Sequence, residues 1–289
     1  MSRVFSLFIF CCLSLAADEQ TVRIVGSDFM TPWLEQVLRD SAVPGPEGVV
    51  LSFDMNGSLP AVSQIRLEEA QAGVVAIPHG EVLPAEPLIA IPIAYKVSRV
   101  FVNESNRNSE ITLGRLADVF GESGSENIQN WGDLSLTQEW ASRTIQPALL
   151  SGVGILSDTL FRAVGMNNQE FSSSIERLYE SDALEALLRR NSNALGIGER
   201  IPEQSGIRQI AVARTVETPG YLPTESAVFF GDYPLVLPFY LVTAEHRRGD
   251  LVWLIRYMLS DGFAQNLEQQ DFVPVPSQER QRLLIEMGQ

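Results

Sequence analysis

The stretch Val22-Arg23-Ile24-Val25-Gly26-Ser27-Asp28 decides the fold, because a β-branched run stops at a Gly/Ser turn and a helical pattern begins at once. The same junction recurs at Asn56-Gly57-Ser58, after the apolar run 49–53, and at Ser151-Gly152-Val153-Gly154, after the run 145–150. A helix that starts directly after a strand leaves unpaired N–H groups and a positive dipole end beside small side chains. Such an end suits a bound anion or polar ligand. These junctions, with no catalytic set beside them, favour a protein that holds a ligand over one that converts it.

The sequence on either side of the first two junctions alternates between strand-like and helix-like patterns. We expect strands at 22–25, 49–53 and 73–77, with helices at 31–38 and 58–65 between them. This β-α-β-α-β order predicts a largely parallel sheet covered by helices on both faces.

A second α/β unit follows a proline-rich stretch, 78–92, that interrupts the alternation. We expect a strand at 97–102, helices at 113–120 and 182–190, a strand at 194–198, a return strand at 234–242, and helices at 251–259, 263–269 and 278–287. A chain that builds one unit, crosses to another and returns predicts two lobes joined by two crossings. Ligands of such folds lie at the carboxyl ends of the strands, in a cleft shared by both lobes.

The first residues have the pattern of an export signal. Arg3 supplies the positive start, an apolar stretch follows at 4–15, and small residues precede the expected cleavage after residue 17. That stretch is too short for a membrane span, which needs roughly 20 residues. Cys11 and Cys12 both lie in this signal, so the mature chain would have no disulfide and no cysteine metal site. We expect a periplasmic or secreted protein, with lipidation at a cysteine as a minor alternative.

The formal net charge of −15 opposes binding to nucleic acid or to an anionic membrane surface, because phosphate contacts need clustered Lys and Arg. His79 and His246 are the only histidines, and their separation gives no metal-site spacing. No serine lies in a nucleophile-elbow pattern. The sequence therefore predicts no enzyme, no metal and no cofactor.

Several further fragments occur in a fixed order along the chain: Gly26-Ser27, Asn56-Gly57-Ser58, Val100-Phe101-Val102-Asn103, Ile111 to Gly121, Ile128 to Trp131, Gly231 to Leu235, Gly262 to Gln265 and Phe272 to Pro274. In their order and spacing they resemble the phosphate-binding proteins of bacterial ABC uptake transporters, in the type II periplasmic solute-binding superfamily. The resemblance implies an α/β fold of two lobes, each a mostly parallel sheet flanked by helices, with a cleft between them. It implies one lobe from 18–94 and 233–289 and a second lobe from 95–232.

The resemblance also implies the function and the binding residues. The chain is expected to be a monomeric, exported solute-binding protein that holds a small oxyanion such as phosphate between its lobes and presents it to an ABC permease. Carried over position by position, the ligand-binding candidates are Ser27, Asp28, Asn56, Gly57, Ser58, Ser151, Gly152 and Gly154. Each also has a purely structural interpretation, as a helix cap or a turn residue.

Two departures from the family pattern leave a second function open. The family usually has an arginine before its third turn, where this chain has Leu149-Leu150. It often has a carboxylate after the third strand, where this chain has Ala76-Ile77-Pro78. The alternative is therefore an interaction or sensory module that has lost high-affinity phosphate binding. Three other arginines are candidates for supplying the missing positive charge to the cleft: Arg99, Arg143 and Arg162.

Overall fold

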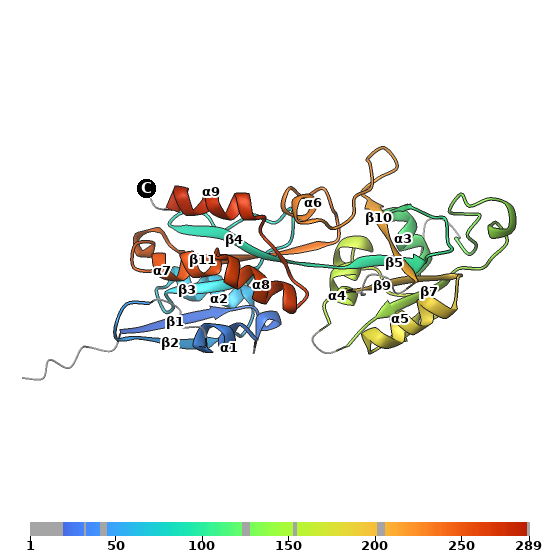
Figure 1. Ribbon diagram of the computed structural model, residues 1–289. Helices are drawn as coiled ribbons and strands as arrows, with labels where there is room; N and C mark the ends of the chain where they lie inside the picture. Colours follow the sequence, from blue (N-terminus) through green and yellow to red (C-terminus); the bar gives the residue numbers. More distant parts are fainter. Residues whose placement is uncertain are drawn as a thin grey trace, which may run out of the picture.

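The computed structural model describes residues 20–31, 33–40, 45–122, 128–152, 155–200 and 206–287. The predicted signal peptide at 1–17 and the candidate Gly154 lie outside these ranges. No helix within them has both the length and the apolar character that crossing a membrane requires. Figure 1 shows two lobes side by side, each with its own sheet.

The first sheet has, within the described ranges, six strands in the order β12-β4-β11-β3-β1-β2. They are β1 (Gln20–Gly26), β2 (Val49–Asp54), β3 (Ala72–Ala76), β4 (Leu88–Val97), β11 (Val236–Ala244) and β12 (Val273–Pro274). Strand β1 pairs in parallel with β2 and β3, whereas β11 pairs antiparallel with β3 and β4. Helices α1 (Trp33–Asp40), α2 (Ser58–Arg66), α7 (Val252–Met258), α8 (Asp261–Gln269) and α9 (Ser277–Met287) belong to this lobe (Figure 1).

The second sheet, counted over the same described residues, has six strands in the order β6-β10-β5-β9-β7-β8. They are β5 (Arg99–Asn103), β6 (Glu110–Thr112), β7 (Gln146–Leu150), β8 (Glu176–Leu178), β9 (Ala194–Gly198) and β10 (Ile207–Ala213). The second lobe also contains helices α3 (Leu113–Phe120), α4 (Ser157–Leu160) and α5 (Ser181–Arg190) (Figure 1). Helix α6 (Glu225–Phe229) lies in the segment that returns from β10 to β11 of the first sheet.

The predicted fold class, two helix-flanked sheets in two lobes, is confirmed. The expectation of a mostly parallel sheet is wrong for the first lobe, where β11 and β12 pair antiparallel with their neighbours, so that three of the five pairings among the described strands are antiparallel. In the second sheet three of the five pairings are parallel.

The lobes are joined where the chain changes sheets, between Val97 and Arg99 on the way out and between Ala213 and Val236 on the way back. Tyr233, which is fully buried, ties these crossings together because its hydroxyl donates to the Ser98 carbonyl oxygen at 2.6 Å. The boundaries given above, 94/95 and 232/233, stay a prediction.

The expected strand at 97–102 is wrong at its start. Strand β4 already begins at Leu88, passes through Pro92 and ends at Val97, and β5 begins only at Arg99. The proline is accommodated because the β4–β11 register shifts beside it, between Phe239 and Tyr240. A residue without an N–H group fits a β-bulge better than a regular ladder.

Candidate functional site

The first lobe brings the first two predicted turns together. Strands β1, β2 and β3 are parallel neighbours, so their carboxyl ends meet at one edge of the sheet. The Gly57 amide donates to the Gly26 carbonyl oxygen at 2.7 Å, and the Ser27 amide donates to the Val74 carbonyl oxygen at 2.8 Å. The turns that the sequence places 30 residues apart thus form one continuous rim.

Two serine hydroxyls of this rim are held by backbone amides and keep their own proton free. Ser58 Oγ accepts from the Ala76 amide at 2.9 Å, and Ser27 Oγ accepts from the Phe29 amide at 3.4 Å. A hydroxyl that accepts one hydrogen bond can still donate one. Neither hydroxyl donates to another group among the described residues, so each keeps one unused donor, and that of Ser27 is buried.

Glycine is required in this rim. Gly26 has a φ of +151°, and a Cβ there would lie 2.0 Å from the Val74 carbonyl oxygen. Gly57 has a φ of +116° and precedes α2 without a side-chain cap. The helix start is therefore open to an external hydrogen-bond acceptor.

Asp28 and Asn56, the other first-lobe candidates, are less suited to ligand contact. Asp28 is exposed in the short 3-10 turn Asp28–Met30, where its charge would repel an anion. The Asn56 side-chain amide donates to Asp54, which also forms an ion pair with Arg23.

The third predicted turn lies in the second lobe. Ser151 follows β7, its amide donates to the Leu178 carbonyl oxygen at 2.8 Å, and its buried Oγ has no hydrogen-bond partner. Gly152 has a φ of +147°. Within the described part of the chain, no hydrogen bond or ion pair joins this turn to the rim of the first lobe, so only a ligand or a lobe movement could connect them.

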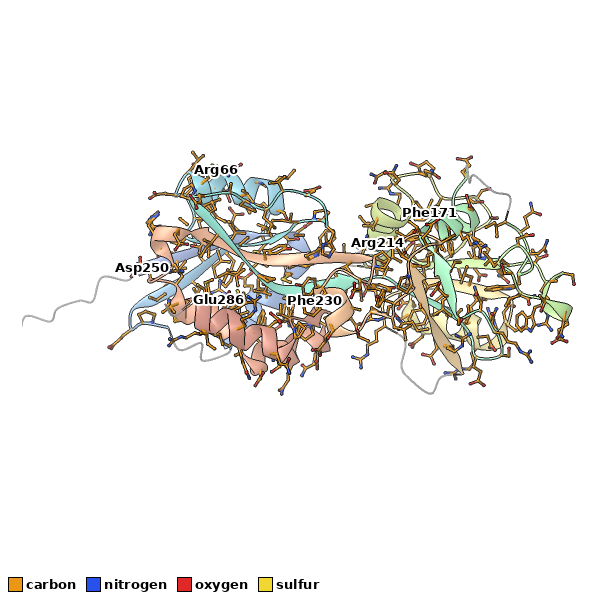
Figure 2. The ribbon with its side chains drawn as sticks, turned by 90° about the horizontal axis from the view of Figure 1, so that it is seen from above. Arg66, Phe171, Arg214, Phe230, Asp250 and Glu286 are labelled. Carbon is orange, nitrogen blue, oxygen red and sulfur yellow. The ribbon has the colours of Figure 1, made fainter. Side chains whose placement is uncertain are left out.

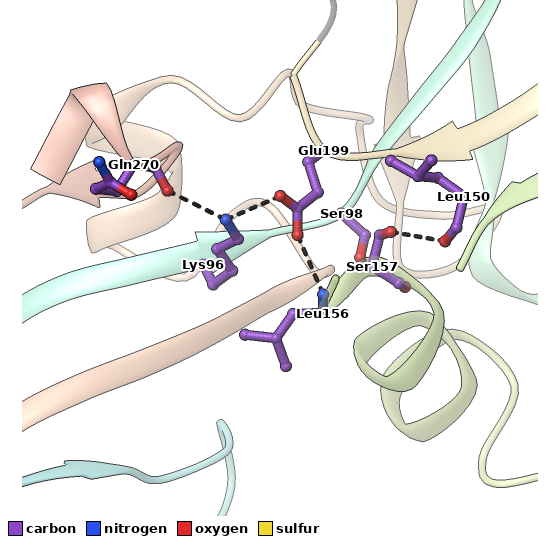
Figure 3. Close-up of polar contacts among 7 residues, drawn as sticks. All are labelled: Lys96, Ser98, Leu150, Leu156, Ser157, Glu199 and Gln270. Atoms are coloured by element: carbon purple, nitrogen blue, oxygen red, sulfur yellow. Dashed lines mark hydrogen bonds and ion pairs between the residues drawn. The ribbon is translucent and has the colours of Figure 1, made fainter. Parts of the chain in front are cut away.

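A carboxylate of the chain itself sits at the start of α4, beyond the third turn. Glu199 accepts from the Leu156 amide at 3.1 Å and lies 3.0 Å from Lys96 Nζ (Figure 3). Lys96 also donates to the Gln270 carbonyl oxygen at 3.3 Å. Sequence reasoning missed this network, although a lone lysine in an apolar strand was a signal for it.

Ser157, another serine near this turn, has a structural role. Its hydroxyl donates to the Leu150 carbonyl oxygen at 3.0 Å, and its own carbonyl oxygen accepts from the Ser98 hydroxyl at 2.9 Å (Figure 3). The second contact links α4 to the crossing between the lobes.

Two of the three arginines singled out from the sequence are engaged within the second lobe. Arg143 lies over the Trp140 ring at 4.2 Å and donates to Ser192 at 3.3 Å. Arg162 lies 3.9 Å from Glu170.

Arg99 and Arg214 are at the junction of the lobes. Arg99 is largely buried, which lowers the pKa of its guanidinium, and its Nη1 has no hydrogen-bond partner. Arg214, which sequence reasoning did not single out, lies where the lobes meet (Figure 2) and donates to the Gly231 carbonyl oxygen at 2.8 Å. Burial lowers the pKa of His79, and the charge of Arg214 lowers it further. Among the described residues no cluster of His, Cys, Asp and Glu could hold a metal ion.

Comparison with known proteins places this geometry in a known fold. No model of a known protein family matches the chain. It is 21% identical over 209 residues to the phosphate-binding protein PstS of Pseudomonas aeruginosa, covering 69% of this chain and 64% of that relative's length.

Solved structures with the same fold include a possible phosphate-binding protein from Planctomyces limnophilus and PstS from Borrelia burgdorferi. The first has a TM-score of 0.68 at 17% identity and covers 94% of this chain and 98% of its own. The second has a TM-score of 0.69 at 16% identity and covers 89% of this chain and 100% of its own. At these identities the likeness shows the fold.

Proposed function

We propose that this protein is an exported solute-binding protein that holds a small oxyanion, phosphate first, between its lobes and presents it to an ABC permease. The observation that carries the proposal is the pair of serine hydroxyls, Ser27 and Ser58, which are fixed by backbone amides with their protons free. They lie at the carboxyl ends of adjacent strands, where ligands of α/β folds bind. The names of two similar proteins, which refer to phosphate binding, add support.

The second half of the proposed site is the turn at Ser151 and Gly152. The Ser151 hydroxyl is buried and unpartnered, and a buried hydroxyl without a partner is costly until something pairs with it. An oxyanion between the lobes would accept from this hydroxyl and from those of Ser27 and Ser58. The protein would act as a monomer, with its export signal at 1–17 removed and with lobes at 18–94 plus 233–289 and at 95–232.

The proposed site relies on neutral donors, which limits its affinity. An arginine adds to a hydrogen bond with the anion the attraction between opposite charges and a second, parallel N–H contact, neither of which a serine hydroxyl supplies. Leu149 and Leu150 stand where the family has an arginine, and Ala76 to Pro78 carry no carboxylate. We therefore expect phosphate binding weaker than a site with a direct arginine contact would give.

The test is a thermal-shift and calorimetric titration of the mature chain with phosphate, sulfate, molybdate and small carboxylates. Phosphate should raise Tm in a concentration-dependent manner. Ser58→Ala should weaken phosphate binding about 10- to 150-fold, because it removes one hydrogen bond to a charged group, which contributes about 1.5–3 kcal/mol. Ser277→Ala, on an exposed position of α9 in the same lobe, is the matched control and should leave binding unchanged. If no anion raises Tm, the proposal is wrong.

One observation favours the second candidate, an interaction or sensory module without high-affinity phosphate binding. The Glu199 carboxylate accepts from the Leu156 amide, so the chain's own anion occupies the start of α4. The variant Glu199→Gln separates the candidates. If the protein is a module that has lost its ligand, Glu199→Gln binds phosphate no better than the wild type does. If it is a phosphate-binding protein in which the Glu199 charge repels the anion, Glu199→Gln binds phosphate more tightly than the wild type.

A further inference from the structure

A cavity at the junction of the lobes is lined by residues other than those of the three turns. Its volume is about 530 Å³, within the usual range of small-molecule sites, roughly 300–1,000 Å³. Arg99 on β5 and Gln209 on β10 line it from the second lobe, and residues 271–274, from Asp271 to Pro274, line it from the first. None of the candidate residues of the phosphate site is part of its lining.

Two donors on the second-lobe wall have no partner. Arg99 Nη1 and Gln209 Nε2 are both buried, and neither forms a hydrogen bond. Gln209 pairs with Phe101 across the antiparallel β5–β10 ladder, so its side chain lies on the same sheet face as those of Phe101 and Arg99. Two neighbouring buried donors without an acceptor are unusual in a folded protein, and a bound acceptor would satisfy both.

Three carboxylates and a second arginine also line the cavity. Asp271 and Glu268 belong to the end of α8 and the residues after it, Glu225 opens α6, and Arg200 follows β9. Arg99 forms no ion pair with any of these carboxylates within the described ranges. The cavity thus carries its unpaired donors together with two arginines and three carboxylates. A ligand with one negative and one positive end matches both kinds of side chain, whereas a ligand with two negative charges is opposed by the more numerous carboxylates.

We propose that this cavity binds a small zwitterion, an α-amino acid, with its carboxylate on Arg99 and Gln209 and its ammonium group toward Glu268 and Asp271. The guanidinium offers parallel N–H donors to a carboxylate, which is the strong form of this contact. Because the residues involved come from different lobes, an occupied cavity favours the lobe arrangement in which they face each other.

The test is a thermal-shift and calorimetric titration of the mature chain with glycine, L-alanine and L-leucine. Acetate and methylammonium, which each carry one of the two charges, are the ligand controls. At least one amino acid should raise Tm saturably and bind at least 10-fold more tightly than acetate or methylammonium. Arg99→Met and Gln209→Leu should each weaken that binding at least 10-fold, and Gln209→Leu keeps the test valid if Arg99→Met does not fold.

Ser58→Ala serves as the matched variant, because it lies in the phosphate site and should leave amino-acid binding unchanged. A failure of phosphate binding is therefore distinguishable from a failure of this proposal. Three results would overturn it: no amino acid raises Tm, both cavity variants bind as the wild type does, or acetate binds as tightly as the amino acids.

Discussion

Replacement of Lys96 by methionine should destabilise the protein by about 3–5 kcal/mol, the cost of leaving one charge of a buried ion pair without its partner. Lys96 Nζ lies 3.0 Å from Glu199 Oε2, and the two side chains are only 7% and 13% exposed. Methionine retains an apolar stem near the Phe272 ring, over which the ammonium lies at 4.9 Å. Most of the loss should therefore come from the stranded Glu199 carboxylate.

A double-mutant cycle with Glu199→Gln isolates the pair. Glutamine keeps an acceptor for the Leu156 amide while removing the charge. The double variant Lys96→Met/Glu199→Gln should lose at least about 2 kcal/mol less free energy of unfolding than the two single variants lose together. The reason is that the double variant contains no buried charge without its partner. Urea unfolding followed by fluorescence and circular dichroism gives each free energy of unfolding.

An exposed ion pair provides the matched control. Arg39 and Glu35 lie one helical turn apart on α1, and their side chains are 52% and 35% exposed. Breaking that pair with Glu35→Gln should cost about 0.3–0.5 kcal/mol. The reasoning is refuted if Lys96→Met costs no more than Glu35→Gln, or if the cycle shows no coupling between Lys96 and Glu199.

Three other changes test separate parts of the structure. Gly26→Ala should cost about 3 kcal/mol or more in urea unfolding, because a Cβ there would lie 2.0 Å from a β3 carbonyl oxygen at a φ of +151°. Tyr233→Phe should cost about 1–3 kcal/mol by the same measurement, since it leaves the buried Ser98 carbonyl oxygen without its 2.6 Å hydrogen bond. Burial, and then Arg214, lower the pKa of His79 from 6.5, so the unfolded chain takes up this proton at a higher pH than the folded one. Wild type should therefore lose stability relative to His79→Gln as the pH falls through 6.5, and a constant difference between pH 5 and 8 would contradict the assignment.

The β1–β2–β3 part of the first lobe could be predicted from the sequence because its pairing is local in the chain. Strands β1, β2 and β3 follow one another with α1 and α2 between them, and each apolar run ends at a turn residue. Gly26 and Gly57 marked those turns because only a residue without a Cβ fits them. Strands β6, β8, β10 and β12 were missed, since each pairs with a strand far away in the sequence.

The part of the candidate site that lies at the ends of β1 and β2 could be predicted from the sequence, whereas the part at the crossing between the lobes could not. Ser27 and Ser58 were predicted as ligand contacts because each follows the end of a strand. The structure joins their turns through backbone hydrogen bonds, and their contact with a ligand stays a prediction. Lys96, Glu199 and Arg99 meet only because the chain crosses between the lobes, and no sequence pattern encodes which residues such a crossing brings together.

The two proposed sites are linked by the arrangement of the lobes. The phosphate site needs the Ser27 and Ser58 rim of the first lobe to meet Ser151 of the second, and the amino-acid cavity needs Asp271 of the first lobe to face Arg99 of the second. Both therefore depend on one variable, the relative position of the lobes about the crossing at Ser98. Linkage makes any such coupling reciprocal, so the factor by which an amino acid changes phosphate affinity must equal the factor by which phosphate changes amino-acid affinity. If both ligands favour the same position of the lobes, each strengthens the other, and if they favour different positions, each weakens the other.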